Sequence, residues 1–184
     1  MFEELGKLSG YLDSCEEPVI TASDLGENVW SEEQFESIQK EFAKQGETIK
    51  RIYPLLPMQE GMLYKHIAES ESWAYRLVSI FEMNMLPKEE ELRRQLDLLG
   101  EKYEVLRTSF VYEDVPVARQ VITDRKLPYE IIDISEEEDT YAAICRIREE
   151  ILTNGYDLTH KALFKVVCAI KDENSCYILI VTHH

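Results

Sequence analysis

Apolar residues recur every three or four positions along five stretches of the chain, which is the spacing of one face of an α-helix. The stretches predicted as helices are 2–12, 31–46, 58–67, 88–103 and 136–152. Ser31 followed by Gln34 forms a capping box, which marks the start of the second helix. A turn bracketed by Pro54 and Pro57 leads into the third.

Short runs that alternate between apolar and polar residues, or are apolar throughout, predict strands. These runs are 75–83, 106–112, 119–123, 129–134, 163–170 and 177–182. The last two are joined by Lys-Asp-Glu-Asn-Ser at 171–175, so we expect a hairpin of two buried strands. Helices and strands are mixed along the chain without an internal repeat, which favours an α/β fold.

The chain has 184 residues, of which 45% are hydrophobic, enough for one domain with a sizeable core and part of a second. Residues 15–30 lose the helical periodicity and are predicted to be an exposed connection. The character of the sequence changes at the turn before residue 58. We therefore predict a boundary near Arg51, with an acidic helical linker at 1–50 and a folded lobe at 51–184.

Charge excludes several classes of partner. Asp and Glu number 36 against 20 Lys and Arg, giving a net charge of −16, so nucleic acids and acidic membranes are not expected to bind. The acidic N-terminus, Met-Phe-Glu-Glu, resembles no signal peptide, and no apolar run approaches the ~20 residues of a membrane span. A cytoplasmic protein is expected.

Cysteine and glycine patterns argue against metal and nucleotide chemistry. Cys15, Cys145, Cys168 and Cys176 form no C-x-x-C pair and have no histidines at zinc-ligand spacing, so reduced thiols are expected and no metal. A Gly-rich phosphate loop is absent from the sequence. Ser109 lacks the His and Asp pattern of a serine hydrolase.

Histidines are the remaining candidates for acid–base chemistry near neutral pH. His66 is interpreted as a half-buried structural residue and His160 as part of a surface loop. His183 and His184 follow the apolar strand 177–182, and a strand end is a rigid place to present catalytic groups. An ordinary polar strand exit and the first residues of an added polyhistidine tag are the alternatives.

Four segments together resemble the N-terminal half of a condensation domain from a nonribosomal peptide synthetase, a domain similar to chloramphenicol acetyltransferase. They stand in the family's order: Ile52-Tyr-Pro-Leu-Leu-Pro-Met-Gln-Glu-Gly-Met-Leu-Tyr64, Tyr103-Glu-Val-Leu-Arg-Thr-Ser-Phe110, Gly155-Tyr-Asp-Leu158 with Ala162-Leu-Phe-Lys165, and Val181-Thr-His-His184. The last resembles the entry to the active-site motif H-H-x-x-x-D-G. Tyr103, Tyr156, Ala162 and Lys165 depart from the family's usual His, Phe, Pro and Arg.

The resemblance implies a two-layer α/β sandwich, the N-terminal lobe of a chloramphenicol acetyltransferase-like domain. It implies that the α-amine of an acceptor aminoacyl thioester attacks a donor peptidyl thioester. His184 would handle the amine's proton, His183 would support it, and Arg107 would pair with the motif's Asp. No cofactor is expected to bind directly, since the substrates arrive on phosphopantetheine arms of peptidyl carrier proteins.

The resemblance also implies neighbours. Residues 1–50 resemble the tail of an epimerization domain, and Met58-Gln-Glu-Gly-Met-Leu63 is similar to condensation domains that take a D-configured donor. Partners would be carrier, epimerization and adenylation domains and a second lobe. Because Asp-Gly of the motif would come after His184, the chain is expected to have little activity by itself. A non-catalytic docking module and a small-molecule acyltransferase are the competing hypotheses.

Overall fold

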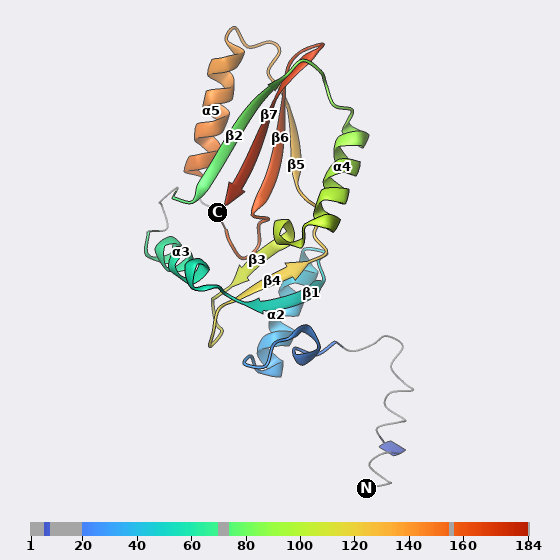
Figure 1. Cartoon of the computed structure of the whole chain (residues 1–184), viewed down its shortest axis with the longest axis vertical. Helices are drawn as coiled ribbons and strands as arrows, with labels where there is room; N and C mark the ends of the chain where they lie inside the picture. Colours follow the sequence, from blue (N-terminus) through green and yellow to red (C-terminus); the bar gives the residue numbers. More distant parts are fainter. Residues whose placement is uncertain (1–5, 8–19, 70–73, 155–156, 184) are drawn as a thin grey trace.

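The computed structural model describes residues 6–7, 20–69, 74–154 and 157–183 (Figure 1). Its helices are α2 (Glu32–Lys44), α3 (Pro57–Ala68), α4 (Glu89–Lys102) and α5 (Thr140–Thr153), with 3-10 turns η1 (Ser23–Leu25) and η2 (Glu104–Arg107). Its strands are β1 (Ile49–Pro54), β2 (Arg76–Met83), β3 (Thr108–Val111), β4 (Arg119–Thr123), β5 (Tyr129–Asp133), β6 (Phe164–Asp172) and β7 (Ser175–His183). The helix predicted at 2–12 lies outside the described residues except for Gly6 and Lys7, which are helical.

Two sheets organise the described part of the chain. The small sheet has the antiparallel order β1-β4-β3, and the large sheet has the order β2-β7-β6-β5, in which β5 alone runs parallel to its neighbour. Figure 1 shows α5 and α4 on either side of the large sheet and α2 beside the small one. The predicted mixed α/β class is confirmed.

Strand β7 lies inside the large sheet, where its side chains alternate between two apolar layers. Tyr177 and Leu179 pack in the layer that contains Ile144 of α5. Ile178 and Ile180 pack against the layer that contains Leu96 of α4. The predicted β6–β7 hairpin is confirmed. Because helices cover both faces around β7, the end of this strand has a well-defined position.

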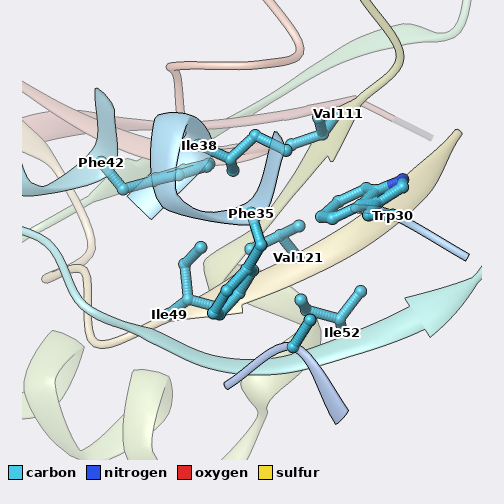
Figure 2. Packing of buried hydrophobic residues seen from close by; sticks show 9 residues of the cluster. Trp30, Phe35, Ile38, Phe42, Ile49, Ile52, Val111 and Val121 are labelled. Atoms are coloured by element: carbon cyan, nitrogen blue, oxygen red, sulfur yellow. The ribbon is translucent and has the colours of Figure 1, made fainter. Parts of the chain in front are cut away.

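Helix α2 shares a core with the small sheet (Figure 2). The capping box predicted at Ser31 is present: the Ser31 hydroxyl accepts from Gln34 N at 3.2 Å, and the Gln34 side chain accepts from Ser31 N at 2.9 Å. The buried residues that meet in this core are Trp30, Phe35, Ile38, Phe42, Ile49, Ile52, Val111 and Val121. Residues on both sides of the predicted boundary near Arg51 therefore pack together, and the boundary itself stays a prediction.

One predicted strand begins later than the sequence indicates. The apolar run 106–112 starts as the turn η2, and the strand β3 begins at Thr108. Arg107 donates a hydrogen bond from Nε to the carbonyl of Gly100 at 2.8 Å and another from Nη1 to the carbonyl of Thr123. These two bonds hold the turn, and neither is visible in the periodicity of the sequence.

Candidate active site

His183 lies at the end of β7 and is held from both neighbouring strands. It pairs in register with Arg76 of β2, and its backbone N–H donates to the carbonyl of Leu163 at 2.9 Å. Its side chain is buried, with 9% of the residue exposed. The apolar strand predicted before this histidine is present and ends at His183, while the role of His183 stays a prediction.

Next to His183 the structure has a cavity of about 240 Å³, which we call the apolar hollow. It is lined by Leu56, Met58, Gln59, Met62, Leu63, Val105, Phe110, Leu158, Leu163 and His183. Three of the lining side chains, Leu56, Met58 and Val105, are 62%, 71% and 62% exposed. Large apolar side chains that stay exposed around a cavity are typical of a surface that receives an apolar group.

Helix α3 forms one wall of the hollow. Its first residue is Pro57, and the Gln59 side chain accepts from Leu56 N at 2.8 Å, so the start of the helix is fixed. Leu63 is the buried residue of the helix, and Met62 beside it also lines the hollow. Two flexible methionine side chains can adapt to groups of different shape.

Other parts of the lining come from η2 and β3. Val105 lies in η2, and Phe110 lies in β3. Arg107 stands between them in sequence, and its bonds to the Gly100 and Thr123 carbonyls join η2 to α4 and β4. Arg107 therefore fixes the turn that carries Val105 to the hollow.

The floor of the hollow includes Leu158, which is 2% exposed. One carboxylate oxygen of Asp157 accepts hydrogen bonds from the backbone of Thr159 and His160, both at 2.9 Å. The Leu158 carbonyl accepts from Phe110 N at 2.8 Å. The Asp157-Leu158 pair, part of one of the four family-like segments, thus has a structural role: Asp157 closes a turn, and Leu158 packs with Leu63 and Phe110.

Two aromatic rings contact the ring of His183 from outside the hollow. The His66 ring centroid is 6.1 Å from that of His183 with an angle of 86° between planes, and that of Tyr75 is 6.5 Å away at 53°. The pKa of His66 is lowered, first by burial and then by the Arg76 charge, while Asp157 acts in the opposite direction. These ring contacts are not visible in the sequence, because His66 and Tyr75 are more than 100 positions from His183.

The structure describes two of the three residues predicted for the site. His183 lies in the hollow, while His184 is outside the described residues. Arg107 is half-buried and lines a separate cavity of about 300 Å³ with Gly100 and Leu127. Its ion pair with an Asp of the motif stays a prediction.

Among the residues that the structure describes, no group of three or more His, Cys, Asp and Glu is arranged to hold a metal ion. Within the same part of the chain, no helix has the length and apolar character needed to cross a bilayer. Cys145, Cys168 and Cys176 are free thiols.

A comparison with family models identifies the class of protein: the condensation-domain model matches residues 49–184, so the chain belongs to the condensation-domain family. It is 32% identical to bacitracin synthase 1 of Bacillus licheniformis over 185 residues, which cover 99% of the chain and 4% of that synthase. It is 34% identical to tyrocidine synthase 3 of Brevibacillus parabrevis over 149 residues, 77% of the chain and 2% of the relative. The chain therefore spans a few per cent of these relatives.

Solved structures have the same fold. A four-domain nonribosomal peptide synthetase bound to AMP and glycine matches 75% of the chain with a TM-score of 0.64 and 23% identity, over 10% of its own length. The starter condensation domain of rhizomide synthetase matches 73% of the chain with a TM-score of 0.67 and 17% identity, over 34% of its own length. The predicted fold, one lobe of a chloramphenicol acetyltransferase-like condensation domain, is confirmed.

Proposed function

We propose that this chain provides the histidine-bearing lobe of a condensation domain in a nonribosomal peptide synthetase and takes part in peptide-bond formation. The observation that carries the proposal is the position of His183, at the end of a buried strand and beside an apolar hollow, within the segment matched by the family model. The named relatives are synthetases of peptides such as bacitracin and tyrocidine, which supports the same role.

The reaction joins two thioesters. The acceptor's amine nitrogen attacks the donor's carbonyl carbon, a C–N bond forms, the C–S bond breaks, and the proton lost by nitrogen balances the departing thiolate. A thioester is already activated, so positioning of the two reactants can supply about 7–11 kcal/mol of the barrier reduction. His184 accepts or steers the proton, a role typically worth about 10²–10⁴-fold, and His183 supports it from the strand.

Arg107 has a supporting role in this proposal. Its guanidinium presents a planar fork of donors, of which Nε and Nη1 already bind backbone carbonyls. The same group would pair with the carboxylate of the motif's Asp and hold the loop that follows the histidines. Its fixed position at the end of η2 supports such a role, since a bidentate partner needs a rigid guanidinium.

Carrier proteins are the proposed partners. Both substrates would arrive on phosphopantetheine arms, so the chain would bind no cofactor of its own. Epimerization and adenylation domains are the proposed neighbours, the donor is D-configured, and the synthetase works in the cytoplasm. The exposed Met58, at 71%, belongs to the segment whose sequence suggests the D-configured donor.

The docking hypothesis for the acidic leader has less support. In that hypothesis the acidic leader and its helices dock a neighbouring domain or a carrier protein, and the His pair is incidental. However, Phe35, Ile38 and Phe42 are 1%, 7% and 1% exposed, because they pack on the chain's own small sheet. An apolar face that is already buried is not available to a partner.

The proposal is tested with carrier proteins loaded with donor and acceptor. We expect little product from the 184-residue chain and turnover from the chain extended through a second lobe, because the solved starter domain is about three times as long as its matched part. In the extended chain, His184→Ala should lower kcat by about 10²–10⁴-fold. The matched control is His160→Ala, which should leave kcat unchanged. Robust product from the 184-residue chain, or equal losses in the two variants, would contradict the proposal.

A further inference from the structure

We propose that His66 is a positioning residue: its ring fixes the ring of His183 at the end of β7. The contact between the two rings comes from the structure alone, and its catalytic meaning rests on the proposed function. The sequence analysis interprets His66 only as a half-buried structural residue of α3.

The geometry of the His66 and His183 rings supports the positioning role. His66 and His183 meet edge to face, with centroids 6.1 Å apart and planes at 86°. This distance lies in the range of about 4.5–7 Å in which aromatic pairs prefer a T-shaped arrangement. Tyr75 contacts the same ring at 6.5 Å, and its backbone is held in the left-handed region at φ 66°. The His183 ring is therefore held by side chains from two separate elements.

Arg76 faces His183 in the β2–β7 register. It is 6% exposed, and its Nη1 donates to the carbonyls of Leu152 at 2.7 Å and Asn154 at 2.6 Å. These carbonyls belong to the C-terminal end of α5, where a positive charge is favourable. Arg76 thus fixes the strand opposite His183.

The charge state of His66 also supports the positioning role. The groups that face it are Arg76 and Asp157, together with the rings of Tyr75 and His183. Burial and the Arg76 charge both lower the pKa of His66, so its imidazole is neutral near pH 7. A neutral ring can pack against His183, whereas a protonated ring would place a second cation near Arg76.

The residue that follows His183 in the chain is the proposed catalytic one. In the proposed function His183 supports the catalytic residue that follows it, so displacement of the His183 ring would weaken that support. A misplacement of about 1 Å can cost up to 10²-fold in rate. His66 would therefore affect turnover without touching substrate.

The contact is tested first by NMR of the imidazole groups in the 184-residue chain. His66→Ala removes the ring, His66→Phe keeps an edge-to-face partner without titration, and His160→Ala is the control. We expect the His183 signals to move in His66→Ala, to stay close to the wild type in His66→Phe, and to be unchanged in His160→Ala. Unchanged His183 signals in His66→Ala would overturn the proposal.

The positioning role is tested in the chain extended through a second lobe. We expect His66→Ala to lower kcat about 10-fold or more with little change in KM, and His66→Phe to restore kcat near pH 8. His66→Phe should also remove the part of the acid-side fall in kcat that comes from protonation of His66. A merely structural role predicts instead that kcat follows the melting temperature, so Ile38→Val, a core variant in α2, serves as the stability control.

Two further outcomes are decisive. If His66→Ala and an equally destabilised Ile38→Val lose the same kcat, the positioning role is overturned. If the unsubstituted extended chain gives no turnover, the proposed function fails and the positioning role with it. In that case moved His183 signals would show that the ring contact itself is real, which separates the two failures.

Discussion

The carboxylate of Glu27 accepts a hydrogen bond from Nε of Arg119 at 2.5 Å, and this ion pair joins the segment before α2 to strand β4. The Glu27 side chain is fully buried and also accepts from the backbone of Val29 and Trp30. Removing one partner leaves the other charge buried away from water and without a counter-charge. We expect Glu27→Ala to lower the free energy of unfolding by about 3 kcal/mol, measured by urea denaturation.

The control for this prediction is an exposed ion pair in the neighbouring helix. Glu36 and Lys40 are 59% and 74% exposed, so Glu36→Ala should change the free energy of unfolding by less than about 0.5 kcal/mol. Comparable losses in the Glu27 and Glu36 variants would show that burial of the Glu27 pair does not matter.

The same carboxylate predicts a pH dependence. Burial raises the pKa of Glu27, but hydrogen bonds from Val29 N, Arg119 and Trp30 N outweigh it, so the pKa lies below its usual 4.5. A lowered pKa contributes stability that is present above about pH 4.5 and is lost as the pH falls through the folded-state value. Glu27→Gln should therefore lose less stability than the wild type between pH 5 and pH 3, measured by thermal melting. An equal loss of stability in the wild type and in Glu27→Gln between pH 5 and pH 3 would contradict this prediction.

The core of α2 and the small sheet should depend strongly on its aromatic side chains. Phe42 is 1% exposed, and we expect Phe42→Ala to lower the free energy of unfolding by about 3–5 kcal/mol. Phe81, on the edge strand β2, is 51% exposed and provides a matched control, with an expected loss below about 1 kcal/mol. An effect of Phe42→Ala as small as that of Phe81→Ala would mean that α2 does not pack on the sheet in solution.

Periodicity was sufficient to predict α2 to α5 and the strands other than β1, which lies where the sequence predicts a linker and a turn. The turn η2 was not predictable in this way, since Arg107 holds it through carbonyls of Gly100 and Thr123, which belong to other elements. The strand end at His183 could be predicted from the apolar run before it. The hollow could not be predicted, because the residues that line it are spread along the chain from Leu56 to His183. They meet only after the two sheets are assembled.

A buried hydroxyl in β3 gives a prediction of opposite sign. Ser109 is 0% exposed, and its Oγ has no hydrogen-bond partner in the part of the chain that the structure describes. Burying a hydroxyl without a partner costs about 1–3 kcal/mol, so Ser109→Ala should raise the free energy of unfolding by about 1 kcal/mol. Denaturant unfolding measures it, and Thr108→Ala, which shortens a buried neighbour, should be destabilising. A loss of stability in Ser109→Ala would indicate that the hydroxyl does have a partner.

The thiols should differ sharply in reactivity. Cys145 is exposed, whereas Cys168 is buried in β6, and burial together with the nearby Cys176 raises the pKa of Cys168 to about 12. Only the thiolate reacts with iodoacetamide, and at pH 8 a thiol with such a pKa is ionised in about one molecule in 10⁴. In the native chain we expect Cys145 to be alkylated at least about 100-fold faster than Cys168, measured by peptide mass spectrometry. The two rates should converge in urea, since unfolding exposes both thiols, and equal rates without urea would mean that β6 is not protected within the large sheet.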